Sequence, residues 1–101
     1  MSVLMEFAMF PTDKGASVAP YVTRIVKYLK NSPYSYQLTP MGSIIECDSM
    51  SEATKILDEA YKLLEPDCDR VYSSIKFDIR KGKENRMEQK IASVDRELKE
   101  D

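Results

Sequence analysis

The order of strand-like and helix-like segments limits the fold of this chain more than any other feature of the sequence. Four segments alternate apolar and polar residues or are rich in β-forming residues, whereas three repeat apolar residues every three or four positions. We expect strands over residues 2–10, 34–39, 42–47 and 71–80. We expect helices over residues 18–30, 50–64 and 87–98. The resulting order, β-α-β-β-α-β-α, begins with the split β-α-β pattern of ferredoxin-like domains.

This order predicts a single α+β domain over residues 1–101, a ferredoxin-like βαββαβ sandwich with an extra C-terminal helix. Right-handed crossovers make the first two strands parallel and leave the third strand between them. The predicted strand order is therefore 4-1-3-2, and every neighbouring pair is antiparallel. The first two helices should cover one face of the sheet. The apolar residues that we expect to point at these helices are Val3, Met5, Phe7, Val71, Ile75 and Phe77.

The opposite face of the sheet should mix apolar and polar side chains. The residues that alternation places there are Glu6, Ala8, Phe10, Ile44, Glu46, Tyr72, Ser74 and Lys76. This mixture is too apolar for an idle surface and too polar for a core, so we expect the face to meet a ligand or another subunit. The apolar stripe of the last helix also needs a partner, either its own sheet or a neighbouring subunit.

Composition excludes several classes of function. The chain has 15 basic and 17 acidic residues, and this net charge of −2 argues against a general nucleic-acid binder. It has no histidine and only two cysteines, and neither a metal cluster nor a nucleophile–base pair is visible in the sequence, so we expect no catalytic residues and no metal. No apolar run reaches the ~20 residues of a membrane span. The N-terminus does not resemble a secretion signal, and we expect a cytoplasmic protein with reduced thiols.

Three segments should meet at one end of the predicted sheet: the loop 11–17, the hairpin turn 39–42 and the loop 65–70. Unpaired N–H groups at a helix start and the hydroxyls of Thr39 and Ser43 suit a small-molecule pocket built from backbone groups and hydroxyls. A purely structural role is also open. Ser17 has the residue type of a helix N-cap, and Gly42 that of a turn residue.

Two carboxylates, Glu6 and Glu46, should lie near one another on adjacent strands. Neighbouring carboxylates repel unless a proton, a cation or a hydrogen-bond donor lies between them. One interpretation is recognition of a cationic or amino-bearing ligand. The alternative is that they pair with Lys76 across the sheet or with an arginine of another subunit.

One stretch of the chain, Tyr36–Glu46 (YQLTPMGSIIE), resembles the signature of the YkoF-like thiamine-binding protein family. Weaker similarities extend over most of the chain. They are Pro11 after the first strand, Ser17 with Tyr21-Val22 at the first helix, residues 75–80 at the end of the fourth strand, and residues 87–94 in the last helix.

The resemblance implies a non-enzymatic protein that binds thiamine or its hydroxymethylpyrimidine part at a pocket between subunits, as a carrier or a sensor. It implies no other cofactor, and a homo-oligomer that is a dimer of dimers. The residues that it assigns to the ligand are Glu6, Ser17, Thr39, Met41, Gly42, Ser43 and Glu46. The carboxylates would pair with the amino group or the positive charge of the ligand. The hydroxyls and the Gly42 backbone would bind nitrogens of the ligand ring, and Met41 would contact that ring. The alternative function is an oligomeric assembly module with no physiological ligand.

Overall fold

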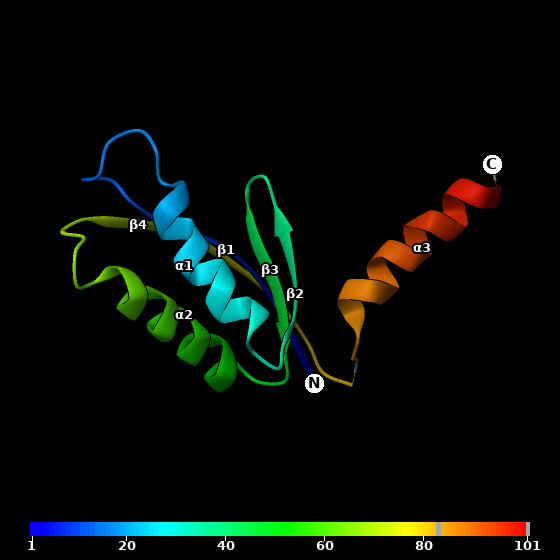
Figure 1. Cartoon of the computed structure of the whole chain (residues 1–101). Coiled ribbons are helices and arrows are strands. Elements are labelled where there is room, and N and C mark those ends of the chain that lie inside the picture. Colours follow the sequence, from blue (N-terminus) through cyan, green and yellow to red (C-terminus); the bar gives the residue numbers. More distant parts are fainter. Residues whose placement is uncertain (83, 101) are drawn as a thin grey trace.

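The computed structural model describes residues 1–82 and 84–100 of the chain and confirms the predicted order of elements (Figure 1). The strands are β1 (Ser2–Pro11), β2 (Ser35–Thr39), β3 (Gly42–Cys47) and β4 (Val71–Arg80). The helices are α1 (Ala19–Lys30), α2 (Met50–Leu64) and α3 (Arg86–Glu100). Within the described residues, none of these helices is long and apolar enough to span a membrane.

The four strands form one antiparallel sheet in the order β2-β3-β1-β4, which is the predicted order. The register between β1 and β3 places Phe7 opposite Ser43 and Glu6 opposite Ile44. Because side chains alternate along a strand, Phe7 and Ser43 share the face under α1 and α2, whereas Glu6 lies on the other, open face. The predicted assignment of side chains to the two faces is therefore confirmed.

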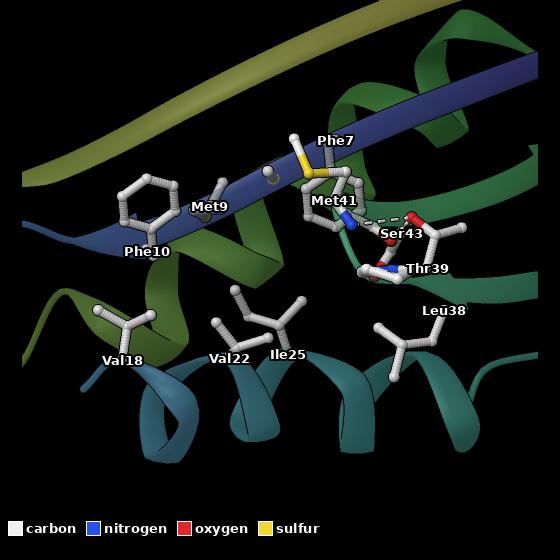
Figure 2. Close-up of a pocket in the computed structure, with 13 residues that line it drawn as sticks. Phe7, Met9, Phe10, Val18, Val22, Ile25, Leu38, Thr39, Met41 and Ser43 are labelled. Carbon is white, nitrogen blue, oxygen red and sulfur yellow. Dashed lines mark hydrogen bonds between the residues drawn. The ribbon is translucent and has the colours of Figure 1, made fainter. Parts of the chain in front are cut away.

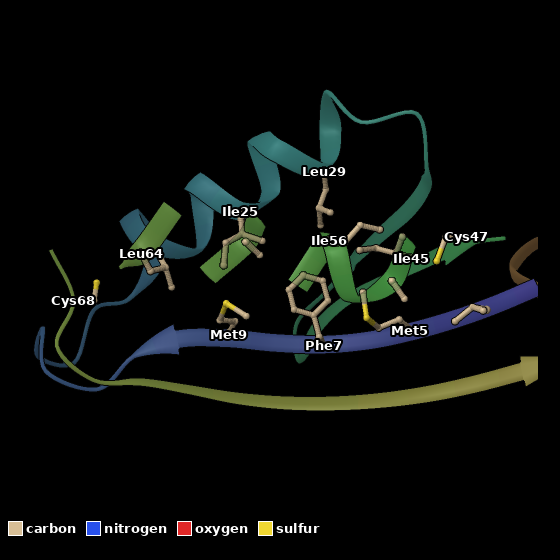
Figure 3. Close-up of a cluster of buried hydrophobic side chains, with 13 residues drawn as sticks. Met5, Phe7, Met9, Ile25, Leu29, Ile45, Cys47, Ile56, Leu64 and Cys68 are labelled. Carbon is tan, nitrogen blue, oxygen red and sulfur yellow. The ribbon is translucent and has the colours of Figure 1, made fainter. Parts of the chain in front are cut away.

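The core lies between the sheet and the two helices α1 and α2, which both cross the same face (Figures 1 and 3). Apolar side chains of β1 and β3 meet the apolar stripes of the helices there. The most fully buried large side chains include Met5, Leu29, Ile45, Ile56 and Leu64. Both cysteines are free and buried, in agreement with the expected thiols. A core of this kind fixes the position of β1 relative to α1, which matters for the site below.

The two helix starts differ in how well the sequence predicted them. The Ser49 side chain accepts a hydrogen bond from the Glu52 N–H at 3.1 Å, so the predicted capping box of α2 is confirmed. The predicted cap at Ser17 is wrong, because α1 begins one residue later, with Val18 at the N-cap position and no side-chain cap. Pro20 explains why α1 can begin without a side-chain cap, since a proline in the first turn removes an N–H that a cap would otherwise satisfy.

The strand β4 is more exposed than the sequence predicted. Ile75 and Phe77 lie on the helix-covered face, as expected, but each keeps 40% of its surface exposed. The physical reason is that β4 is an edge strand, and the helices pack mainly over β1, with β2 and β3 on its other side. Only Val71, at the start of β4, packs against the core.

The last helix, α3, leaves the body of the domain at an angle (Figure 1). Its first turn lies over the open face, and a shallow pocket there lies between Met87 and Leu4. Its apolar stripe continues outward and is largely exposed, at Ile91, Val94 and Leu98.

Candidate functional site

A pocket of about 330 Å³ lies where α1, the end of β1 and the tip of the β2–β3 hairpin meet. We call it the hairpin pocket. It is lined by Phe7, Ala8, Met9, Phe10, Val18, Val22, Ile25, Leu38, Thr39, Pro40, Met41, Gly42 and Ser43. No lining residue carries a charge, and only Thr39 and Ser43 bring polar side chains. An apolar cavity with few polar groups is the usual form of a small-molecule site.

The walls of the hairpin pocket come from three separate elements (Figure 2). Val18, Val22 and Ile25 project from one side of α1 toward the sheet, at the spacing of one helix face. Phe10 closes the end formed by β1, and Met41 lies at the hairpin tip. Met41 is 84% exposed, so the side chain stands at the open rim, where it is free to change conformation.

The hairpin turn is held by its own residues. The Thr39 hydroxyl donates to the Gly42 carbonyl at 2.9 Å and accepts from the Met41 N–H at 3.2 Å (Figure 2). Gly42 has φ +154°, and a Cβ atom there would lie 2.7 Å from the Phe7 carbonyl oxygen. Only glycine permits this close approach of the hairpin to β1. Thr39 and Gly42 therefore shape the pocket, and the Thr39 hydroxyl is already engaged.

Ser43 is the polar group that faces the hairpin pocket. The residue is 6% exposed, and its hydroxyl takes part in none of the side-chain hydrogen bonds of the described residues, including those of the hairpin turn beside it. Among the described residues, every fully enclosed polar side-chain atom does have a partner. The Ser43 hydroxyl must therefore open into the pocket, where it can donate one hydrogen bond and accept others.

Two of the three segments expected to meet at this end of the sheet, the loops 11–17 and 65–70, are joined by hydrogen bonds. The Thr12 N–H donates to the Arg70 carbonyl at 2.8 Å, and the Asp69 N–H donates to the Asp13 carboxylate at 2.8 Å. Arg24 of α1 pairs with Asp67 at 2.8 Å. The hydrogen bond from this guanidinium lowers the pKa of Asp67 to about 2. These links hold α1 and the end of β1, which both line the hairpin pocket, against the loop 65–70.

Four of the seven predicted site residues come together in the hairpin pocket: Thr39, Met41, Gly42 and Ser43. Ser17 precedes the lining residue Val18 but is itself exposed and outside the lining. Glu6 is exposed on the open face, where it stands opposite Lys76 and borders the pocket beside α3.

Glu46 holds the start of α3. The Ser2 hydroxyl donates to Glu46 Oε2 at 2.7 Å, and the Arg86 N–H donates to the same oxygen at 2.9 Å. The Met87 N–H donates to Oε1 at 3.2 Å. Burial raises the pKa of this carboxyl, but the hydrogen bonds that it accepts outweigh burial, so the net pKa is lowered from 4.5. Its carboxylate thus caps the helix N-terminus, in the way that anions do there.

The side chain of Arg86 completes this anchor. It is only 4% exposed, and its guanidinium pairs with Asp78 at 3.0 Å. Its Nε also donates to the Ser2 hydroxyl at 3.1 Å. The anchor joins the start of β1 and the end of β4 to α3, and none of its residues lines the hairpin pocket.

Sequence reasoning placed the start of the first helix near the site but missed the apolar side chains of α1, and Met9 of β1, that line the pocket. Val18, Val22 and Ile25 form an apolar helix stripe, which the sequence assigns to the core. Met9 appears only as an alternating strand residue, and Phe10 only on the open face that we expect to meet a ligand or another subunit. The strand lengths carried a usable signal for the end of β1. The first strand is longer than the hairpin strand that pairs with it, so its last residues extend beyond that partner.

The fold and this pocket define a class of protein: a ferredoxin-like α+β domain with an uncharged cavity suited to a small ligand. Comparison with known proteins gives the family. The family model described as thiamine-binding protein matches residues 5–95. The chain therefore belongs to the thiamine-binding protein family, as its sequence resemblance indicated.

Individual relatives agree with this assignment. The UPF0045 protein MJ1052 of Methanocaldococcus jannaschii is 37% identical over 92 residues, which cover 91% of each chain. Its crystal structure superposes with a TM-score of 0.82 over 92% of this chain and 95% of that chain, at 36% identity. The UPF0045 protein Mb1933 of Mycobacterium bovis is 33% identical over 97% of this chain and 96% of its own.

A more distant structure shares the fold alone. TM0486 of Thermotoga maritima, which is described provisionally as a thiamine biosynthesis or salvage protein, is 16% identical to this chain. Its structure superposes with a TM-score of 0.79 and covers 93% of this chain and 99% of that chain.

Proposed function

We propose that this protein binds thiamine, or the hydroxymethylpyrimidine part of it, in the hairpin pocket and does not transform it. Membership of the thiamine-binding protein family supports a ligand of this kind. The observation that carries the proposal is the hydroxyl of Ser43, a nearly buried polar group that faces an otherwise apolar cavity without a partner in the described chain. Such a group is satisfied when a ligand supplies the missing hydrogen bond.

The size and chemistry of the pocket support a single flat ring. A volume of about 330 Å³ is near the lower end of the ~300–1,000 Å³ typical of ligand sites. Phe10 and the exposed thioether of Met41 offer aromatic and polarizable contacts to such a ring. The lining has no charge to pair with a cation, so the thiazolium part of thiamine would lie toward the rim.

We also propose that the binding protein is a homo-oligomer, a dimer of dimers. Exposed apolar side chains on β4 and on the outer part of α3 support a second subunit, because such surfaces are seldom left in water. Glu6 and Glu46 enter the ligand proposal only through another subunit, since both lie on the open face, away from the hairpin pocket of their own chain.

The proposed role is that of a carrier or sensor in the cytoplasm. Two free, buried thiols fit a reducing compartment. The same exposed apolar surfaces favour a second candidate function, an assembly module without a physiological ligand.

Calorimetric titration of the purified oligomer with thiamine and with hydroxymethylpyrimidine separates these candidates. The proposal predicts saturable binding of at least one of them and no heat from nicotinamide, a heteroaromatic control. Sedimentation of the same sample reports its oligomeric state. An oligomer that gives no binding heat at millimolar ligand would contradict the binding function and favour the assembly module.

A further inference from the structure

The end of β1 extends beyond the hairpin that pairs with it. β4 pairs with β1 over its whole length, from Ser2 to Pro11, whereas β3 pairs with it only from Val3 to Phe7. The last residues of β1 thus have a neighbouring strand on one side only. The unpaired side is the one that borders the hairpin pocket.

The direction of the backbone groups along this edge can be fixed from two contacts. In an antiparallel sheet the N–H and C=O of one residue point to the same side, and successive residues alternate. The Thr12 N–H donates to the Arg70 carbonyl, which directs even-numbered residues toward β4. The Phe7 carbonyl lies against Gly42, which directs odd-numbered residues toward the hairpin.

The N–H and C=O of Met9 therefore point toward the hairpin side. The position opposite Met9 falls at Met41, which lies in the turn and not in β3. Within the described chain, no backbone partner pairs with either Met9 group. Pro11 fits the same pattern, because its missing N–H would have pointed to this unpaired side.

The hairpin pocket thus contains a short polar strip in an apolar cavity: the N–H and C=O of Met9, with the Ser43 hydroxyl on the neighbouring strand. A ligand that left these groups without partners would lose affinity, because unpaired buried polar groups are costly. The complementary ligand edge carries a ring nitrogen that accepts and an adjacent amino group that donates.

We infer that the Met9 peptide edge recognises an aminopyrimidine ring, with the ring nitrogen accepting from the Met9 N–H and the amino group donating to the Met9 carbonyl. The inference rests on the proposed function and goes further by naming the recognising atoms. The Met9 peptide edge selects the pyrimidine part of thiamine over the thiazole part, because a thiazole offers no adjacent acceptor nitrogen and amino donor. Ser43 then bonds a second polar group of the same ring.

A ligand series on the natural chain tests this recognition. The probes are 4-amino-5-hydroxymethyl-2-methylpyrimidine, its 4-oxo counterpart without the amino donor, and 5-(2-hydroxyethyl)-4-methylthiazole. Calorimetry should give at least tenfold weaker binding for the 4-oxo compound and no saturable binding for the thiazole. Equal affinity for the amino and 4-oxo compounds would overturn the inference.

A backbone variant tests Met9 itself without changing its side chain. Cys47 permits chemical ligation of a synthetic segment 1–46 to residues 47–101, so residue 9 can be introduced as the α-hydroxy analogue of methionine, which replaces its N–H with an ester oxygen. A matched control carries the ester at the exposed loop residue Ala16. Thermal melting confirms that both ligated proteins fold.

The ester at residue 9 should weaken aminopyrimidine binding at least fivefold, and the ester at Ala16 should leave it unchanged. Unchanged binding by the residue 9 ester would overturn this inference but leave the proposed function standing. Failure of the natural chain to bind any thiamine-related probe would overturn both.

Discussion

Replacement of Glu46 by glutamine should loosen α3 from the domain. The carboxylate accepts hydrogen bonds from the Ser2 hydroxyl and from the N–H groups of Arg86 and Met87, at 2.7, 2.9 and 3.2 Å. A glutamine has only one acceptor oxygen, and its amino group would face a backbone donor. The substitution therefore weakens the cap of α3 and leaves at least one N–H of the first turn without a partner.

The expected cost follows from these contacts. Loss of a helix N-cap costs about 1–2 kcal/mol. The outer part of α3 offers little compensation within the chain, since Ile91, Val94 and Leu98 are 50%, 59% and 67% exposed. A loss of about 1–2 kcal/mol corresponds to roughly 5- to 30-fold more frequent local opening. The effect should be confined to α3, because the α1 and α2 core does not depend on Glu46.

Hydrogen exchange measured by mass spectrometry reports this local opening directly. Amides from the first two turns of α3 should exchange roughly 5- to 30-fold faster in Glu46→Gln, while those of α1 and α2 keep their protection. Glu6→Gln is the matched control, because Glu6 shares the open face but contacts no α3 N–H in the described structure. Unchanged exchange in α3, together with lost thiamine binding, would refute the cap and return Glu46 to the ligand site.

Three further predictions concern the pocket end of the domain. Ser43→Ala should weaken ligand binding about 2- to 10-fold, which is the worth of one hydrogen bond, whereas the exposed control Ser74→Ala should not; equal affinities measured by calorimetry would exclude the hydroxyl from the site. Gly42→Ala should lower the free energy of unfolding in urea by about 1–3 kcal/mol more than Gly15→Ala, because the new Cβ meets a β1 carbonyl at 2.7 Å only at position 42; equal losses would show that the close approach is unimportant. The pKa of Asp67 is lowered from 3.8 to about 2, so the stabilisation that its ionised form contributes is present above pH 3.8 and is lost as the pH falls toward 2. Asp67→Asn should remove that part of the acid dependence of the free energy of unfolding. Identical pH profiles of the free energy of unfolding for the two proteins would contradict the ion pair.

Local patterns predicted most of the fold. Alternation along β1, the capping box at Ser49 and the apolar stripes of the helices each depend on neighbours in sequence, and all three were found as expected. Handedness of the crossovers then left one strand order. The cap at Ser17 failed because a proline in the first turn of α1 changed what the helix start required.

The candidate site was predictable only in part. Thr39, Gly42 and Ser43 were predicted from the local signal of a tight turn with adjacent hydroxyls, whereas Met41 was assigned through the family resemblance; all four line the pocket. The role of Glu46 as the cap of α3 depends on Arg86, which lies 40 residues further along the chain. No local sequence pattern predicts such a contact. The unpaired edge at Met9 depends on the register between β1 and β3, which only the three-dimensional structure gives.

Methyl NMR of the natural chain with labelled methionines tests the central claim, that a small heteroaromatic ligand binds between α1, β1 and the hairpin. Met9 and Met41 line this pocket, whereas Met87 lies at the start of α3 and Met50 at the start of α2. Titration with hydroxymethylpyrimidine should shift the Met9 and Met41 methyl signals through the ring current of the bound ligand and leave Met50 and Met87 in place. Shifts at Met87 without shifts at Met9 and Met41, or no shifts at saturating ligand, would contradict the account.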